Sequence, residues 1–402
     1  MRAPRVLAAV LFAMLVSGGS VLAQTPADLF DINTIQEIRL SVNTRDLQTL
    51  REKYKDNTYY VADLTWKNIK VRNVGIRSRG QGSRNPTKLG LRVDIAHYTT
   101  GQTFVGFSTI ILDNMWQDDS MLRERLAFTM FEKVGEPAPR ESFCRLYINN
   151  EYQGLYAIIE EIDGAFAKRV TGETDGTMFE YRWYIDKQWR AEDLVSIANY
   201  KTLLEPRTHV LDADSTLYGP IQSLFKEVNA AADAVWRDRV EQYIDLNQYM
   251  KHVALEQFIV ENDGLLGYAG MNNFYLYRYQ GTTKHRLFVW DKDNAFLFKD
   301  NVPGAVTTSD NVLFRRAMTY PDLRETYLST LEQCANIART DDFLALEIDR
   351  LTAIIYDAAK ADPRKQFPND QFDLAVQFLR DFAAVRPGQV LTDVARIRKT
   401  GS

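Results

Sequence analysis

The 402-residue chain is poor in the residues that build metal centres and covalent frameworks, with only two cysteines and four histidines. Cys144 and Cys334 are too few and too far apart for a disulfide framework. They form either one long-range bridge or, at least as readily, two buried free thiols. The histidines are scattered and form no helical pair with zinc-ligand spacing, which disfavours a zinc enzyme.

The chain also lacks a long basic run and, beyond its N-terminus, any stretch apolar enough to cross a bilayer. Its formal net charge is −4, so nucleic acid and anionic membrane surfaces are poor candidates for its main partners. With 45% hydrophobic and 25% charged residues, the composition is that of an ordinary globular protein. The length favours two domains, or two lobes around a cleft.

The first 23 residues have the features of a secretory signal peptide. Residues 1–5 are basic, and Val6 to Val16 form an apolar run too short to span a bilayer comfortably. Val21-Leu22-Ala23 is a small-x-small cleavage signal, with cleavage expected before Gln24. The sequence therefore predicts an exported protein, in the periplasm, outside the cell or at its surface, with residues 24–35 as a linker.

Strand-like patterns dominate residues 36–163, and helical patterns dominate residues 164–402. We expect an α+β fold with a sheet-rich N-terminal lobe, which carries a nucleotide-binding sheet plus one helix, and a mostly helical C-terminal lobe. Within the second lobe, residues 273–279 and 285–290 are expected to pair as a hairpin. The helices that follow Pro321 are expected to break at three places, near Asp341, Pro363 and Pro387.

A glycine-containing loop follows the strand predicted over residues 69–78. It reads Arg79-Gly80-Gln81-Gly82-Ser83-Arg84, with Lys88 shortly after it. Its backbone amides can approach a phosphate closely, and Lys88 and Arg92 are expected on one face of the next strand. These features suit an anionic ligand such as a nucleotide tail. The alternative is a hairpin turn with solvated basic side chains, which composition alone favours.

Acidic residues end a strongly apolar strand at Glu160 and Glu161, where the composition changes. This segment is either a hinge whose backbone meets the flat polar edge of a ligand or a solvated strand end. A second acidic residue, Asp263, lies on a glycine-rich loop after a long helix. It is either a base that accepts a proton from a hydroxyl or part of a helix-terminating turn.

Two carboxylates, Asp291 and Asp293, follow the apolar strand that ends at Trp290. If the chain stays extended, both project to one side and Lys292 to the other. Hairpin pairing brings Asn273 to the same end, and two carboxylates with an amide oxygen suit Mg²⁺. The alternative is a pair of solvated acids that stop the strand. Phosphoryl transfer needs these parts, namely a phosphate cover, a cation on the nucleotide phosphates, a base near the acceptor hydroxyl and metal ligands, and their order along the chain is the strongest evidence for it.

The motifs together resemble those of the CotH family, the spore-coat-type atypical protein kinases. The matching segments run in order from about residue 36 to 398. They include Arg79-Gly80-Gln81-Gly82-Ser83-Arg84 with Lys88, Asn114-Met115-Trp116-Gln117-Asp118, Gly135-Glu136-Pro137-Ala138-Pro139-Arg140, Tyr147-Ile148-Asn149-Asn150-Glu151-Tyr152-Gln153-Gly154-Leu155-Tyr156, Asn273-Phe274-Tyr275-Leu276-Tyr277-Arg278, Trp290-Asp291-Lys292-Asp293-Asn294-Ala295-Phe296 and Leu379-Arg380-Asp381-Phe382.

The resemblance implies a protein with a two-lobed kinase-like fold. Such a protein transfers the γ-phosphate of ATP to Ser or Thr of a protein substrate, with Mg²⁺ or Mn²⁺. It implies that Lys88 and Arg79 hold the ATP phosphates and that Asp263 is the catalytic-loop aspartate. It further implies that Asn273 and Asp291 bind the metal, with Asp293 as an additional metal or structural candidate. Glu124, on the helix after the glycine loop, is a candidate partner for Lys88.

Two other functions remain open at this stage. One is a surface or coat protein that keeps the kinase-like fold for binding and no longer transfers phosphate. The intact acids at Asp263, Asp291 and Asp293 argue against it. The other is a secreted hydrolase that uses a pair of carboxylates on a sugar. The nucleotide-type loop and Lys88 argue against this second alternative, because a neutral glycan needs neither.

Overall fold

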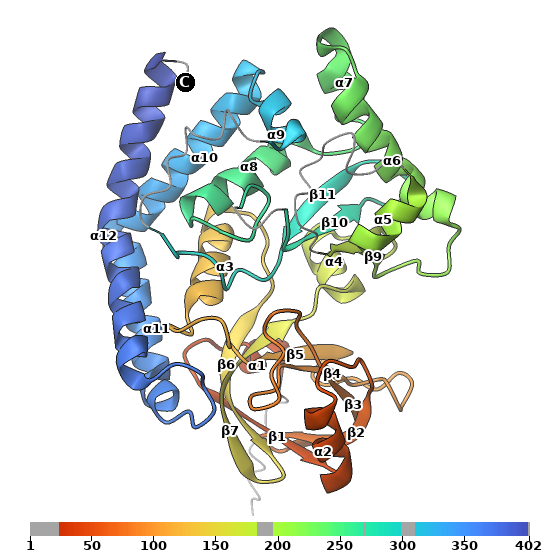
Figure 1. The fold of residues 1–402 in the computed structure, drawn as a ribbon, viewed down its shortest axis with the longest axis vertical. Helices are drawn as coiled ribbons and strands as arrows, with labels where there is room; N and C mark the ends of the chain where they lie inside the picture. The colour runs from red at the N-terminus through yellow and green to blue at the C-terminus, as the bar shows by residue number, and fades with distance from the viewer. Residues whose placement is uncertain (1–23, 183–195, 268–270, 299–309, 401–402) are drawn as a thin grey trace, which may run out of the picture.

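The computed structural model describes residues 24–182, 196–267, 271–298 and 310–400. The predicted signal peptide lies outside these ranges. The described chain is a mixed α+β protein, as expected, with a closed β-barrel at one end and a helix-rich part around a small sheet at the other (Figure 1). No helix in the described ranges is long and apolar enough to cross a membrane.

The barrel has seven strands in the order β1-β2-β3-β4-β5-β7-β6, and β6 closes it by pairing in parallel with β1. Alternating strand residues fill its interior, where Trp66, Leu64 and Ile110 are fully buried. Asn149 and Asn150, both with positive φ, form the hairpin tip between β6 and β7. The strands are β1 (Gln36–Val42), β2 (Tyr60–Trp66), β3 (Ile69–Ser78), β4 (Leu91–Asp94), β5 (Thr109–Asp113), β6 (Glu141–Ile148) and β7 (Glu151–Glu160).

Helix α3 (Arg123–Val134) follows the barrel strand β5 in the chain but packs into the core of the helical part. The carboxylate of Asp118 accepts hydrogen bonds from the backbone N–H groups of Ser120 and Arg123, and Gly135 ends the helix in the left-handed conformation. Asp118 thus satisfies the first backbone N–H of the helix from outside it, and the helix begins only after Leu122. Two short helices, α1 (Pro26–Leu29) and α2 (Thr44–Glu52), lie on the barrel.

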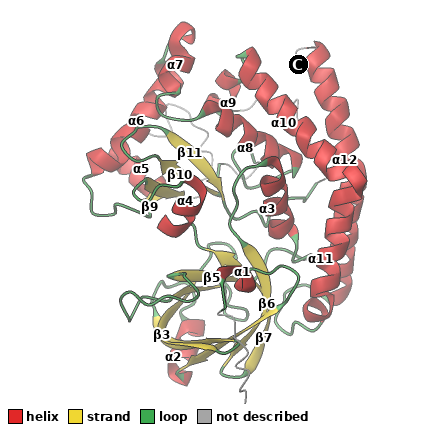
Figure 2. Cartoon of the chain, turned by 180° about the vertical axis from the view of Figure 1, so that it is seen from behind, coloured by secondary structure: helices red, strands yellow, loops and turns green. Residues whose placement is uncertain are grey.

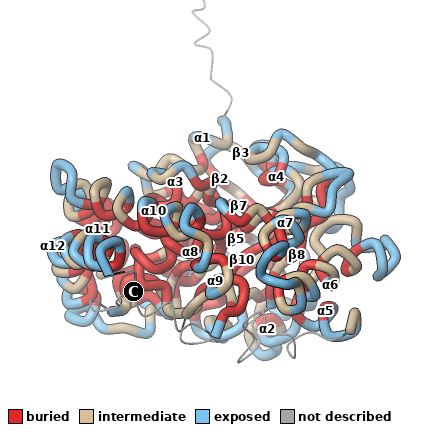
Figure 3. Tube along the Cα trace, turned by 90° about the horizontal axis from the view of Figure 1, so that it is seen from above, coloured by how far each residue is buried: buried red, intermediate tan, exposed pale blue. Residues whose placement is uncertain are grey.

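The helical part surrounds a four-stranded sheet of order β11-β10-β8-β9. The predicted hairpin is confirmed as β10 and β11, with Phe274 opposite Val289. Figure 3 shows that α8 and β10 lie among the buried segments at the centre of the molecule. The elements are α4 (Gly164–Thr171), β8 (Thr177–Tyr181), α5 (Ile197–Leu203), β9 (Leu204–Pro206), α6 (Asp214–Ala230), η1 (Asp233–Val235), α7 (Trp236–Val240), α8 (Leu246–Phe258), β10 (Phe274–Arg278), β11 (His285–Val289) and α9 (Val312–Ala317).

The C-terminal helices run along one side of the molecule, and the turn between α11 and α12 lies beside the barrel (Figure 2). Two of the three predicted breaks are confirmed, at the 3-10 turn that contains Asp341 and in the segment 361–368. The break at Pro387 is wrong: a proline removes one main-chain hydrogen bond, but buried residues such as Phe382 and Val390 hold the helix in place on both sides. These helices are α10 (Pro321–Arg339), η3 (Thr340–Asp342), α11 (Phe343–Lys360) and α12 (Asn369–Thr400).

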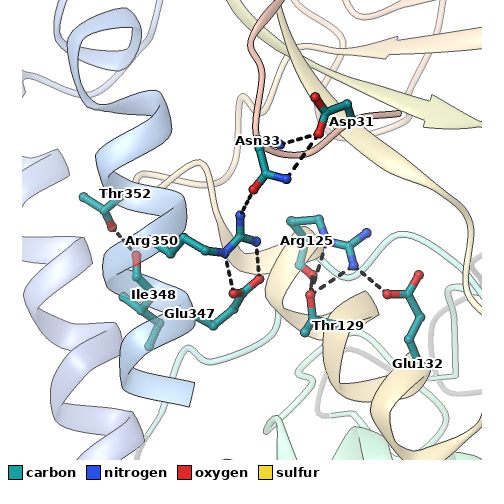
Figure 4. A network of polar contacts seen from close by, with 9 residues as sticks. All are labelled: Asp31, Asn33, Arg125, Thr129, Glu132, Glu347, Ile348, Arg350 and Thr352. Atoms are coloured by element: carbon teal, nitrogen blue, oxygen red, sulfur yellow. Dashed lines mark hydrogen bonds and ion pairs between the residues drawn. The ribbon is translucent and has the colours of Figure 1, made fainter. Parts of the chain in front are cut away.

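The segment 24–35 connects the barrel to the helical part. Ser142 of β6 donates a hydrogen bond to the carbonyl oxygen of Leu29, and Asn33 accepts one from Arg350 of α11 at 2.7 Å. Figure 4 shows Arg350 between Asn33 and Glu347, with which it forms a bidentate pair. A hollow of about 890 Å³ beside this contact, between α3, α10 and α11, carries none of the predicted site residues.

Candidate active-site cleft

A cavity of about 370 Å³ lies between the barrel and the sheet of the helical part. Its walls come from the β3–β4 loop, from the end of β7, and from the segments that flank β10 and β11. Nine of the predicted site residues line it, namely Arg79, Gly80, Gly82, Ser83, Glu161, Asp263, Asn273, Asp291 and Asp293. The fold thus brings together residues that are up to 214 positions apart (79 to 293).

The glycine loop is held in shape by one of its own side chains and by one from outside it. Gly80 has a φ of 99°, and a β-carbon there would lie 2.3 Å from the hydroxyl of Ser83. Arg84 donates to the carbonyl oxygen of Gly80 at 2.7 Å, and Asn114 donates to that of Ser83 at 3.0 Å. The loop is therefore a compact turn at the mouth of the cleft, and glycine is required at position 80.

Arg79 brings a positive charge to the cleft. Its guanidinium pairs with Asp113 at the end of β5 and lies 5.6 Å from the centre of the Trp290 ring. Burial works against this charge, but the surrounding carboxylates, first Asp113 and then Asp291, raise the pKa of Arg79. The guanidinium stays protonated and faces the carboxylate end of the site.

Asp263 is oriented by two amides on the far side of the cleft. Its carboxylate accepts hydrogen bonds from the side chains of Asn272 and Asn273, all at 3.1 Å. Its own backbone N–H donates to Glu261 at 2.8 Å. Burial raises the pKa of Asp263 to about 6, and the nearby charge of Asp291 adds to this effect. A carboxylate with this pKa is ionised at neutral pH and is a better proton acceptor than an ordinary aspartate.

Asp291 and Asp293 lie at the deep end of the cleft, but not for the reason expected from the sequence. β11 ends at Val289 and Asp291 has a φ of 50°, so the chain does not stay extended through Lys292. Burial, together with the mutual repulsion of the two carboxylates, raises the pKa of Asp293 well above its usual range. Among the described residues, no Lys or Arg forms an ion pair with either one.

The donor set at this end fits a hard divalent cation. Two partly buried carboxylates, which have no ion-pair partner among the described residues, lie beside the amide of Asn273, and oxygen donors of this kind suit Mg²⁺ or Mn²⁺. No cluster of three or more His, Cys, Asp or Glu in the described ranges has metal-binding geometry. A cation here would take its remaining oxygens from water and from a bound phosphate, as Mg²⁺ commonly does.

Lys292 has a role that the sequence did not reveal. Its side chain is fully buried on the side away from the cleft, where Nζ donates to Glu256 of α8 at 2.8 Å and to the carbonyl oxygen of Asn273 at 2.9 Å. Glu256 in turn accepts from the backbone N–H of Leu265 at 2.7 Å. This buried pair ties together the three segments that carry Asp263, Asn273 and Asp291. In the sequence, the alternation of Lys292 with two acids was the one sign that its side chain points away from theirs.

Lys88 is not in the cleft, which corrects its predicted position. β4 begins only at Leu91, so the strand alternation that placed Lys88 beside Arg92 does not extend back to it. Its buried Nζ donates to Asp362 at 2.7 Å and to the carbonyl oxygen of Leu155 at 2.8 Å. The suggested pair with Glu124 is also wrong, because Glu124 approaches Asp291 and the backbone N–H of Lys292 instead.

The two glutamates at the end of β7 have different environments. Glu161 lines the cleft and pairs with Arg92, which the predicted strand face had placed next to the ligand. Glu160 does not line it, because Arg140 and Arg169 hold its carboxylate at 2.6 Å each on the other side of the strand. Only Glu161 can therefore contact a molecule in the cleft.

The cleft carries charges of both signs. Arg79 and the backbone amides of the glycine loop come from the barrel, whereas Asp263, Asp291 and Asp293 come from the helical part. Basic and amide groups suit a polyanion, and the carboxylates suit a divalent cation bound with it.

Comparisons with known proteins agree with these motifs. The chain is 23% identical over 348 residues to "Inner spore coat protein H" of Bacillus subtilis (strain 168), across 83% of this chain and 91% of that protein. It is 20% identical over 263 residues to "Spore coat protein homolog 1" of Rhizopus delemar, across 63% of this chain and 41% of that protein. The family model described as "CotH kinase protein" matches residues 76–390, and the chain belongs to this CotH family.

Proposed function

We propose that this CotH-family chain is an ATP-dependent protein kinase that phosphorylates Ser or Thr of protein substrates. The observation that carries the proposal is the convergence of Arg79, Asp263, Asn273 and Asp291 on one cleft from four separate segments. A glycan hydrolase needs a carboxylate pair but no cationic glycine loop, so the cleft favours a nucleotide over a neutral sugar. The barrel and the helical part then correspond to the two lobes of an atypical kinase-like fold.

In the proposed reaction the substrate hydroxyl oxygen forms a bond to the γ-phosphorus of ATP. The bond from that phosphorus to the oxygen bridging the β-phosphate breaks, and ADP leaves with the electron pair. Asp263, held by Asn272 and Asn273, accepts the hydroxyl proton. Arg79 and the amides of the glycine loop orient the phosphates and offset their charge.

Asp291, Asp293 and Asn273 are the residues that would hold Mg²⁺ or Mn²⁺, which supplies charge stabilisation for the transferred phosphoryl group. The side-chain amide of Asn273 can serve both Asp263 and the cation, because its nitrogen already donates to Asp263 while its oxygen remains available. Lys292 supports this residue from behind through its carbonyl oxygen. Glu161 and Arg92 are placed to line the part of the cleft nearest the chain crossing between the two lobes.

We also propose that the protein is exported through residues 1–23 and acts in the periplasm, outside the cell or at its surface. Residues 24–35 would be the linker, 36–163 the N-terminal lobe and 164–402 the C-terminal lobe. The names of the relatives, which are spore coat proteins, support a coat or surface location. They also favour a second candidate, a coat protein that binds through this fold without transferring phosphate.

The deciding experiment incubates the mature protein with γ-labelled ATP and Mg²⁺ or Mn²⁺, beside Asp263→Asn and Asp291→Asn. Asp233→Asn is the matched control, because this side chain is 99% exposed and does not line the cleft. We expect labelling of the protein itself or of a Ser/Thr substrate by wild type and control, and a loss of at least about 100-fold in both cleft variants.

Each other outcome identifies which part of the proposal is wrong. A folded wild type that labels nothing but melts at a higher temperature with ATP and Mg²⁺ supports the binding-only coat protein. If it neither labels nor binds, both candidates lose their basis. Label that survives in Asp291→Asn contradicts the metal assignment.

A further inference from the structure

The turn between α11 and α12 reaches the barrel, although it lies more than 200 residues further along the chain. In Figures 1 and 2, α12 reaches from the far end of the helical part to the barrel, and α11 ends beside β7. Asp362, in this turn, is 5% exposed, and its carboxylate contacts the backbone of β7. None of the groups in this contact lines the cleft.

Asp362 is surrounded by donors from both parts of the molecule. It pairs with Lys88 Nζ at 2.7 Å, with both side chains fully buried, and accepts from the backbone N–H of Leu155 at 3.0 Å. Its other oxygen accepts from the backbone N–H groups of Arg364 and Lys365 at 2.8 and 3.0 Å. Two ionised groups are costly to bury, so this contact needs every one of these bonds.

Strand β7 is shaped to receive this carboxylate. Gly154 has a φ of 123°, and a β-carbon there would lie 2.3 Å from Asp362 Oδ1. Any other residue would be strained and would displace the acid. A second contact borders the first, because Arg364 donates to the carbonyl oxygen of Thr87 at 3.0 Å and pairs with Glu151 of β7.

Lys88 in turn lies at the end of the glycine loop. The side-chain nitrogen of Asn114 donates to the carbonyl oxygen of Lys88 at 2.7 Å and to that of Ser83 at 3.0 Å. Asn85 accepts from the backbone N–H groups of Thr87 and Lys88. A short chain of contacts therefore runs from Asp362 through Lys88 and Asn114 to Ser83 in the loop.

We propose that Asp362 is a positioning residue for the glycine loop. It fixes Lys88, and through it the loop that covers the phosphates, in a conformation that the barrel alone does not maintain. This inference rests on the proposed function in one respect, that the loop binds a nucleotide phosphate. The lysine of the nucleotide-type motif then acts from a distance, as the anchor of the loop rather than as a ligand of the phosphates.

The test compares Asp362→Asn with Asp373→Asn in the full mature chain. Asn keeps an acceptor for Leu155 but removes the charge opposite Lys88, whereas Asp373 belongs to an exposed pair with Lys360 on the same two helices. Amide hydrogen exchange of a peptide spanning 79–90 reports on the loop without any ligand. We expect faster exchange there in Asp362→Asn, with unchanged exchange in α8 and in β1.

Nucleotide binding gives a second readout that a general loss of stability would not produce. ATP contacts the loop through its phosphates and adenosine does not, so we expect Asp362→Asn to weaken Mg·ATP binding about tenfold or more and adenosine binding less than about twofold. Arg364→Gln, which removes only the contact at the rim, provides a milder version if Asp362→Asn fails to fold.

The proposal is overturned if loop exchange and the ratio of ATP to adenosine affinity in the folded variants match those of Asp373→Asn. It is also overturned if exchange rises equally in α8 and β1, since the effect is then global. A wild type that binds neither ATP nor adenosine refutes the proposed function instead, and loop exchange still decides the positioning role.

Discussion

Replacement of Lys292 by methionine tests whether the buried pair behind the cleft holds the site together. Methionine fills similar space but removes the ammonium that donates to Glu256 and to the carbonyl oxygen of Asn273. The Glu256 side chain is 1% exposed, so without Lys292 its carboxylate stays buried beside the His252 ring at 3.3 Å and has lost its ammonium partner. We expect Lys292→Met to be strongly destabilising and to weaken metal-dependent nucleotide binding.

The magnitude follows from the burial of the pair and from the pKa of Glu256. Burial by itself raises this pKa, but Lys292 and, after it, His252 outweigh burial and hold it at about 2, below its ordinary value of 4.5. That difference corresponds to about 3 kcal/mol of stability, present above pH 4.5 and lost as the pH falls toward 2. This value agrees with the cost of removing one partner of a buried ion pair, which is about 3–5 kcal/mol.

The assay is urea unfolding, followed by tryptophan fluorescence, of wild type, Lys292→Met, Glu256→Gln and the double variant. The double variant leaves no unpaired charge, so its loss should be smaller than the sum of the single losses by at least about 2 kcal/mol. Lys70→Met, which breaks an exposed pair with Asp63, is the control and should cost less than about 1 kcal/mol. Additive single losses, or a loss in Lys292→Met no larger than in the control, would refute this reasoning.

Three further predictions concern other parts of the molecule. Burial lowers the pKa of His285 to about 4, so the folded protein binds this proton more weakly than the unfolded chain does. Between pH 7 and pH 5, wild type should therefore lose about 2 kcal/mol more stability than His285→Gln in paired urea unfolding curves. Equal losses would contradict this. Arg386→Met removes donors to the carbonyl oxygens of Gln257 and Phe258 at the end of α8 and should lower unfolding stability by about 2–3 kcal/mol, whereas Arg380→Met, at an exposed pair, should change it by less than about 1 kcal/mol. Gly80→Ala should weaken Mg·ATP binding at least about tenfold, because alanine is strained at a φ of 99°, while Gly101→Ala, with positive φ but open space, should leave binding unchanged in the same calorimetric titration.

Local patterns were sufficient for much of the fold. The caps of α3, the Asn149-Asn150 hairpin tip and the β10–β11 hairpin depend on residues within a few positions of one another, and each was predictable. The same holds for the break at Asp341. The helix through Pro387 shows the limit, because packing over its whole length outweighs one proline.

The two carboxylates after Trp290 show the same limit within the site. The sequence put Asp291 and Asp293 on one side and Lys292 on the other, and the structure has that separation although Asp291 is not extended. What Lys292 contacts could not be read from its neighbours, because Glu256 lies on a different helix. Its function depends on a contact rather than on a pattern.

The order of the parts can be read from the chain: a glycine loop, an acid on a loop, an asparagine that opens a hairpin, and two acids that close it. This order is readable because turns, caps and strand pairing are local. The directions of the two basic side chains depend instead on the folded protein, in which Arg79 faces the cleft while Lys88 turns away from it to meet Asp362, 274 residues later. A buried charge requires a partner wherever the fold supplies one, and no local pattern specifies where that partner lies.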